Sequence, residues 1–188
     1  MVKKIINQSI QDHKKTLQDL QIIKIEEASD IILNAVKSSK TIFWCGNGGS
    51  ASQASHLSAE MIGGMYKNKI PPFKSICLNS DTSFITAWSN DDSFDNIFSR
   101  QLEALSSPGD LLITLSTSGN STNLLNAADY AKQNNLTIIS LTGNDGGELK
   151  KKSDFNLNIF SSNTQTIQEM HILIGHILCA IVEQNEKY

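Results

Sequence analysis

Apolar residues recur at helical spacing over the first part of the chain. Between Lys3 and Ser38 they lie at helical spacing, which predicts one or two opening helices over 3–38. A second long helical pattern closes the sequence and predicts a final helix over 164–186. This last pattern is longer and more apolar than the surface of one domain usually requires. We therefore expect both terminal helical regions to lie at subunit interfaces.

Between these helices, short and nearly continuous apolar runs have the length of strands. They are 41–45, 75–79, 111–116, 137–142 and 155–160. Helical patterns at 50–65, 95–106 and 122–134 separate several of them. Runs that are apolar on both faces and alternate with helices indicate a parallel sheet covered on two sides. The pattern predicts a doubly wound α/β fold, and 188 residues are enough for a single domain over 1–188.

Composition narrows the classes of partner. Hydrophobic residues make up 39% and charged residues 19%, which is typical of a globular enzyme. The formal net charge of -3 gives no field that attracts a nucleic-acid backbone, so we expect no nucleic acid as partner. The apolar stretch 171–182 is too short to span a bilayer, so we expect no membrane either. Lysines near the N-terminus are followed by no apolar stretch, which argues against a secretory signal.

The three cysteines are Cys45, Cys77 and Cys179, and each lies in an apolar run without metal-finger spacing. We expect reduced core residues in a cytoplasmic protein.

Two loops at strand ends are unusual. The first strand runs into Gly46-Asn47-Gly48-Gly49-Ser50-Ala51, and the third into Ser116-Thr117-Ser118-Gly119-Asn120-Ser121-Thr122. In parallel sheets ligands bind at the carboxyl ends of the strands, and glycines followed by a helix offer free N–H groups to an anion. Such residues are also common in ordinary turns and caps, but two such loops on one sheet edge favour a phosphate site.

Gly46, Gly48 and Ala51 also match the dinucleotide pattern G-x-G-x-x-A. The acidic residue expected about 20 positions later, at the end of the second strand, is missing, because Asp81 comes too late. We expect no nucleotide cofactor.

His56 and Glu60 lie four residues apart and so share one helix face. The pair is suited to metal binding or proton transfer, although an isolated pair of this kind is more often a surface ion pair. Gln168 and His176 interrupt the final apolar helix, separated by about 12 Å of rise and about 80° of rotation. A buried, hydrogen-bonded histidine is the ordinary explanation for either imidazole of this helix. If both residues serve one site, neighbouring chains must each contribute, and we expect Glu60 of one chain beside His176 of another.

Several segments together resemble the phosphoheptose isomerases of the sugar isomerase (SIS) superfamily, over nearly the whole chain. They are CGNGGSA (45–51), His56 and Glu60, SNDDSF (89–94), FSRQLEAL (98–105), PGDLLITLSTSGNS (108–121), LTGNDGGEL (141–149) and IQEMHILIGHIL (167–178). The resemblance implies a flavodoxin-like, five-stranded parallel sheet and a homotetramer with active sites at subunit interfaces. It also implies conversion of sedoheptulose 7-phosphate to D-glycero-D-manno-heptose 7-phosphate. This is the first step of ADP- or GDP-heptose synthesis for bacterial lipopolysaccharide or capsule.

The resemblance also implies roles for individual residues. Glu60 and His176 match the catalytic pair, which suits an enediol mechanism in which Glu60 is the base and His176 the acid. A divalent metal, usually zinc, is implied at His56, Glu60, Gln168 and His176. The implied substrate-binding residues are Asn47, Gly48, Gly49, Glu60, Asn90, Asp91, Ser116, Thr117, Ser118, Ser121 and Gln168.

Two other functions stay open. A non-catalytic relative of this fold binds a replication-initiation protein, and that branch resembles this chain in the same loops but lacks the glutamate and the second histidine of the last helix. An isomerase of another phosphosugar is the second alternative, because single hydroxyl contacts in a pocket decide between sugars.

Overall fold

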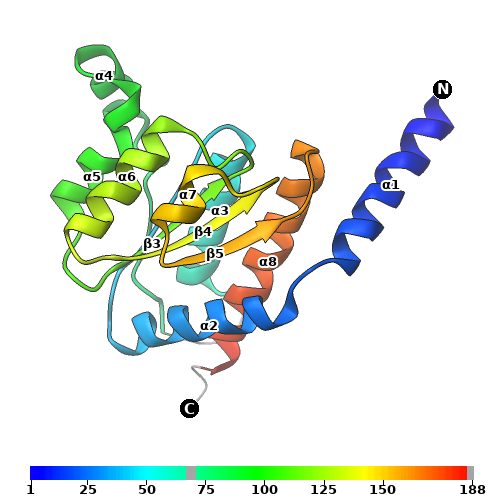
Figure 1. Cartoon of the computed structure of the whole chain (residues 1–188). Coiled ribbons are helices and arrows are strands. Elements are labelled where there is room, and N and C mark those ends of the chain that lie inside the picture. The colour runs from blue at the N-terminus through cyan, green and yellow to red at the C-terminus, as the bar shows by residue number, and fades with distance from the viewer. Residues whose placement is uncertain (67–70, 186–188) are drawn as a thin grey trace.

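The computed structural model describes residues 1–66 and 71–185, and within them five strands form one parallel sheet in the order β2-β1-β3-β4-β5 (Figure 1). The strands are β1 (Ile42–Gly46), β2 (Ser75–Cys77), β3 (Leu111–Ser116), β4 (Thr137–Gly143) and β5 (Phe155–Ile159). The predicted parallel sheet, covered on two sides, is confirmed. Two strands are shorter than predicted: β2 ends at Cys77 rather than residue 79, and β5 at Ile159 rather than residue 160.

Helices connect the strands and cover both faces of the sheet. They are α1 (Val2–Gln18), α2 (Ile22–Lys37), α3 (Gly49–Gly63), α4 (Thr82–Asp91), α5 (Ile97–Leu105), α6 (Thr122–Gln133), α7 (Gly147–Lys152) and α8 (Thr164–Asn185), with a short 3-10 helix η1 (Phe94–Asn96) before α5. The opening helical region divides into two helices. The last residue predicted for the final helix, Glu186, lies outside the described residues.

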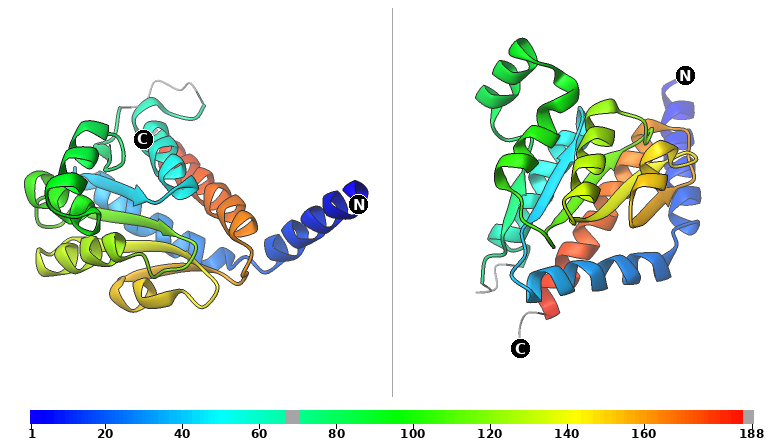
Figure 2. Two further views of the ribbon diagram at one scale, coloured as in Figure 1. Left: turned by 90° about the horizontal axis from the view of Figure 1, so that it is seen from above. Right: turned by 60° about the vertical axis from the view of Figure 1, so that its left-hand side comes forward.

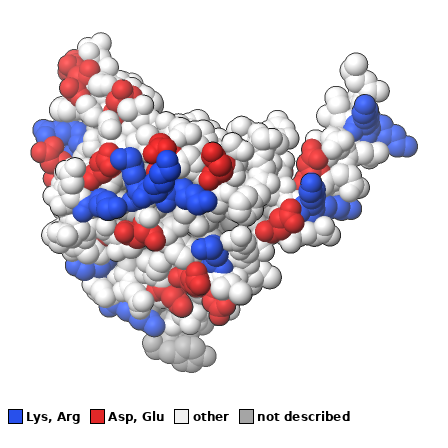
Figure 3. Space-filling model, viewed as in Figure 1, with Lys and Arg blue, Asp and Glu red and all other residues white. Residues whose placement is uncertain are grey.

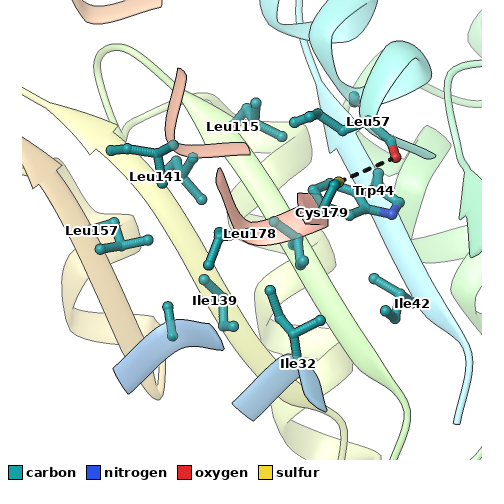
Figure 4. Close-up of a cluster of buried hydrophobic side chains, with 14 of the residues drawn as sticks. Ile32, Ile42, Trp44, Leu57, Leu115, Ile139, Leu141, Leu157, Leu178 and Cys179 are labelled. Atoms are coloured by element: carbon teal, nitrogen blue, oxygen red, sulfur yellow. Dashed lines mark hydrogen bonds between the residues drawn. The ribbon is translucent and has the colours of Figure 1, made fainter. Parts of the chain in front are cut away.

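The alternation of side chains along the strands builds two cores. On one face, Ile42, Trp44, Leu115 and Ile139 pack against α2, α3 and α8 (Figure 4). On the other face, residues such as Phe43 and Leu112 pack against α5, α6 and α7. Successive strand residues point to opposite faces, so both helix layers are held by the same strands. The three cysteines are free and buried, as predicted, and burial raises the pKa of the Cys45 thiol well above its ordinary value.

The final helix α8 lies in the first of these cores, beside α3. It extends beyond the apolar stretch 171–182 and is long and apolar enough to cross a membrane by length and composition alone. Half of that apolar window is buried inside the domain, as in the core helix of a soluble protein. Met170, Ile174, Leu178 and Val182 pack within the core next to the sheet.

Two helices project from the body of the molecule. Figures 1 and 2 show α1 as an arm at one side and α4 as a protrusion at the other. Thr16 is the buried residue of α1, and none of the residues of α4 is buried. His13 Nδ1 of α1 lies 2.9 Å from Glu169 Oε2 of α8, which ties the base of the arm to the domain. Charges of both signs are interspersed over the face in Figure 3, with a lysine group where α7 ends in Lys150, Lys151 and Lys152.

The sequence pattern missed α4 and α7. The side chain of Asp81 accepts a hydrogen bond of 2.9 Å from Phe84 N and so caps the start of α4. Phe84, Ile85 and Trp88 pack against the second core but are only partly buried, and they span little more than one helical turn, which is too short for periodicity to detect. Helix α7 has six residues, fewer than two turns, and follows Gly146 in the left-handed conformation.

Candidate active site

The two unusual loops lie side by side at the carboxyl edge of the sheet. Strands β1 and β3 are direct neighbours, with Gly46 opposite Leu115, so the loops that follow them leave the sheet together. Gly48 has a φ of 56°, a conformation that favours glycine, and α3 begins at the next residue. A Cβ at Gly49 would lie 2.8 Å from Gln168 Nε2. Glycine at this position therefore lets α8 bring Gln168 against the first loop.

The hydroxyl groups of the second loop differ in burial and in hydrogen bonding. Ser116 is buried, and its Oγ accepts a hydrogen bond of 3.1 Å from Gly119 N, so it shapes the loop. Ser118 is exposed, and its Oγ accepts 3.2 Å from Asn120 N, which leaves its O–H available to donate. Ser121 precedes α6 and makes no side-chain cap hydrogen bond to that helix. Thr117 is half-buried between them. Ser118 and Ser121 are thus the hydroxyls best placed to meet an anion.

Helix α7 braces this second loop from outside the sheet. Leu149 N donates to Gly119 O at 2.9 Å, and Glu148 N donates to Asn120 Oδ1 at the same distance. A Cβ at Gly147 would lie 2.5 Å from Ser118 O, which shows how closely α7 approaches. An element that the sequence pattern missed therefore fixes the shape of the second loop.

The candidate acid and base form a cluster between α3 and α8. His56 Nε2 lies 2.8 Å from His176 Nε2 and 3.6 Å from Glu60 Oε1. The two rings meet edge to face, with centroids 5.0 Å apart. At 2.8 Å one imidazole must donate its Nε2–H while the other accepts, so a proton is shared within the cluster. Glu60 is 23% exposed and His56 47%, which leaves the cluster open to a ligand.

Cys179 lies beside this cluster without taking part in it. Burial, and after it the nearby carboxylates of Glu60 and Glu183, raise the pKa of the thiol to about 12. Its Sγ donates to Leu57 O at 3.9 Å. The sulfur therefore stays a neutral thiol and is no nucleophile.

Gln168 lies apart from this cluster. Its Nε2 is 3.5 Å from Ser50 Oγ at the start of α3, and its backbone carbonyl accepts 2.6 Å from Gln53 Nε2. Eight residues of α8, about 12 Å, separate it from His176. The sequence-based expectation that Glu60 and His176 come from different chains is wrong, because one chain brings His176 to the His56–Glu60 face. Of the four predicted metal-binding residues, Gln168 is the one that a single chain does not bring to this cluster.

Asn90 and Asp91 end the projecting helix α4 and are exposed. Asn90 Nδ2 donates to Asp91 Oδ1 at 2.8 Å. Helix α4 projects from the domain (Figure 1).

The structure brings together only part of the set of residues predicted to bind a metal. Two imidazole nitrogens and a carboxylate oxygen are groups that zinc binds, and they converge at His56, Glu60 and His176. Across 1–66 and 71–185, no three His, Cys, Asp or Glu side chains are gathered closely enough to hold an ion by themselves. The residues present are the right kind for zinc, but a site needs a further ligand and small side-chain movements.

Two asparagines that hold the loops were missed by sequence reasoning. Asn79 brackets Gly46, accepting from its N at 3.1 Å and donating to its O at 2.9 Å. Asn123 pairs with Asn47 through two side-chain hydrogen bonds of 2.9 Å. Asparagines at a strand end and in a first helical turn are ordinary by pattern, so no signal in the sequence separates these two.

The fold and the site define the class of protein. A family model of the SIS domain matches residues 7–143, more than half of the chain, so this is a SIS domain protein. It is 44% identical to the phosphoheptose isomerase of Sulfurimonas denitrificans, over 97% of this chain and 96% of that one.

Two solved structures agree with that relationship. The phosphoheptose isomerase of Neisseria gonorrhoeae is 33% identical with a TM-score of 0.92, covering 98% of this chain and 100% of that one. The enzyme of Francisella tularensis is 33% identical with a TM-score of 0.90, covering 97% and 96%. The chain belongs to the phosphoheptose isomerase family.

Proposed function

We propose that this chain is an aldose–ketose isomerase that converts sedoheptulose 7-phosphate to D-glycero-D-manno-heptose 7-phosphate. The observation that carries the proposal is the cluster of Glu60, His56 and His176. Glu60 and His56 lie on α3, the helix that follows the first ligand loop, and His176 lies on α8. A binding protein has no need for a carboxylate and a shared imidazole proton side by side. Family membership points to the same reaction, and both support it over the initiator-binding alternative.

The reaction moves one proton from C1 to C2 and one from O1 to O2, and it needs no outside oxidant. Glu60 takes a proton from C1 of the ketose, and the electron pair of that C–H bond forms the C1–C2 double bond while O2 accepts a proton. The resulting enediol loses the proton of O1, C2 gains a proton, and the carbonyl is left at C1. His176, which shares a proton with His56, is suited to serve the two oxygens. Carbon and oxygen protons are thus handled by different side chains.

The two ends of the sugar require separated sites, and the chain supplies them. The phosphate on C7 suits the hydroxyls of Ser116, Thr117, Ser118 and Ser121, and the backbone N–H groups of Gly48 and Gly49 suit the sugar beside it. His56 lies seven residues after Gly49 on α3, about 10 Å of helix rise, which matches a substrate whose carbonyl is at the opposite end from its phosphate. We assign Asn90, Asp91 and Gln168 to substrate contacts as well, and Asn47 contributes to the substrate site through the first loop that it helps to hold.

Zinc is the metal that this donor set suits, held by His56, Glu60 and His176 with Gln168 of a neighbouring subunit. When bound, it supplies positive charge that stabilises the oxygens of the enediol. Glu60 would help to hold the metal and would also act as the base toward carbon, and its two carboxylate oxygens allow both roles.

A homotetramer is the assembly we propose. The arm α1 exposes Ile5, Ile6 and Ile10 at 60%, 52% and 47%, and α4 buries none of its residues. An exposed apolar face such as that of α1 is expected to pack against other copies of the chain. Such packing also presents Asn90, Asp91 and Gln168 to sites of neighbouring subunits. Light scattering of the purified protein tests the subunit number.

The decisive experiment gives sedoheptulose 7-phosphate to the purified, zinc-replete protein and follows formation of the aldose phosphate. Turnover of this ketose, faster than that of six-carbon ketose phosphates, is the expected result. No turnover with any ketose phosphate would overturn the enzyme assignment and favour the binding-protein alternative. In the cell the product would supply heptose for lipopolysaccharide or capsule, and we place the enzyme in the cytoplasm.

A further inference from the structure

Asn47 and Asn123 form a closed pair between the two ligand loops. Asn47 Nδ2 donates to Asn123 Oδ1, and Asn123 Nδ2 donates to Asn47 Oδ1, each at 2.9 Å. Asn123 is the second residue of α6 and is 2% exposed. Asn47 lies between β1 and α3, 76 residues earlier in the chain. Each amide uses its oxygen and one of its two N–H groups on the other.

The Asn47–Asn123 pair links the first loop to the start of α6. The neighbouring strands β1 and β3 place these two segments close together but do not bond them to each other. Asn47 lies in the first loop, which follows β1, whereas α6 begins directly after the second loop, which follows β3. The backbone of Gly46 is already held on its other side by Asn79. The first loop is therefore fixed from the β2 side through its backbone and from the β3 side through Asn47.

We infer that Asn123 is a positioning residue. It holds Asn47 and thereby fixes the position of the first loop relative to the second loop, where the phosphate is proposed to bind. Since the oxygen and one N–H of the Asn47 side chain are bonded to Asn123, we expect the backbone N–H groups of Gly48 and Gly49 to meet the sugar. Asn123 acts through Asn47. This role rests on the proposed isomerase function. It extends the site to a buried residue of α6 that touches no substrate.

The test compares Asn123→Ala, Asn47→Ala and the double variant with Asn126→Ala. Asn126 is the matched control because it lies one turn further along α6, and its Nδ2 donates to Asp95 O at 3.0 Å and Asn96 Oδ1 at 3.1 Å, away from the loops. The measurements are KM and kcat with sedoheptulose 7-phosphate, and the inorganic phosphate concentration that raises the unfolding temperature by half its maximum.

We expect Asn123→Ala and Asn47→Ala to raise KM by the same factor, about tenfold, with kcat changed by less than about threefold. The double variant should be no worse than either, because both substitutions break one pair. Asn126→Ala should lower the unfolding temperature without changing KM. The half-maximal phosphate concentration should rise in the first three variants and stay unchanged in the control.

Several results would overturn the role of Asn123. They are an unchanged KM and phosphate response in Asn123→Ala, additive effects in the double variant, or an equal loss in Asn126→Ala. If Asn123→Ala does not fold, Asn47→Ala alone carries the test, since an increase in KM without a change in phosphate response would show Asn47 contacting the sugar directly. If the parent protein turns over no ketose phosphate, the isomerase proposal fails, and the phosphate response still decides the loop-positioning role.

Discussion

His56 and His176 lie 120 residues apart in the chain, and their Nε2 atoms are 2.8 Å apart. They meet because α3 and α8 run alongside each other in the same direction, with Gln53 bonded to Gln168 at one end and Met65 N to Glu183 Oε2 at the other. Glu60 lies one turn beyond His56 on α3. The proposed acid and base therefore belong to the same subunit.

Mixed oligomers test that assignment. Glu60→Gln chains refolded with His176→Ala chains should stay as inactive as either variant alone, because every cluster then lacks one partner. Glu60→Gln chains mixed with Gln168→Ala chains should regain part of the parent activity, since Gln168 lies about 12 Å along α8 from His176 and is proposed to serve a neighbour. Recovery in the first mixture, measured on oligomers shown to be mixed, would contradict the same-subunit cluster.

Glu60→Gln should reduce turnover by at least about a hundredfold while the fold survives, because the amide keeps the shape and cannot accept the carbon proton. Glu103→Gln is the matched control, since Glu103 is an exposed carboxylate paired with Arg100 on α5. The measurement is kcat, with circular dichroism to confirm the fold. Residual activity within about tenfold of the parent would rule out Glu60 as the base.

Ser118→Ala and Ser121→Ala should mainly weaken substrate binding, because they remove donors to the phosphate rather than proton carriers. Each lost hydrogen bond to a charged group should cost about 1.5 to 3 kcal/mol, seen as a raised KM. Ser106→Ala serves as control, since its hydroxyl donates to Leu102 O at the end of α5. A loss confined to kcat, with KM unchanged, would argue against a phosphate site in this loop.

His171 should make stability depend on pH. Burial lowers the pKa of its imidazole from 6.5 to about 4, although the hydrogen bond to Thr142 O opposes the shift. As pH falls from about 6.5 to 4, the imidazole of residue 171 becomes protonated in the unfolded chain but stays mostly neutral in the folded chain. The contribution is fully present above pH 6.5 and lost as pH falls toward 4, by about 3 kcal/mol.

The measurement for His171 is denaturant unfolding between pH 8 and pH 4 of the parent and of His171→Met. The loss over this range should be about 3 kcal/mol smaller in the variant. His13→Gln is the control, because the His13 side chain is 41% exposed on the arm α1. Equal pH dependence in the parent and His171→Met would show that another group causes the acid sensitivity.

The sequence was informative where periodicity reports burial. Continuous apolar runs at β3 and β4 predicted strands covered on both faces, and both are buried along almost their whole length. The short helix α7 and the unburied helix α4 were missed, since neither has an apolar face long enough to show a period. Residue 79 was predicted to end β2 but lies beyond that strand. It is the asparagine whose side chain hydrogen-bonds to the backbone of Gly46.

For the site, the sequence by itself determined which chemical groups are available and which of them share an element. Spacing along one helix placed His56 and Glu60 on one face and separated Gln168 from His176, because helix geometry is local. Only the tertiary structure decided which elements meet: His176 with His56, and Asn123 with Asn47. Such contacts depend on how helices pack across the sheet, and packing is set by the shapes of many buried side chains at once rather than by the spacing of any two residues.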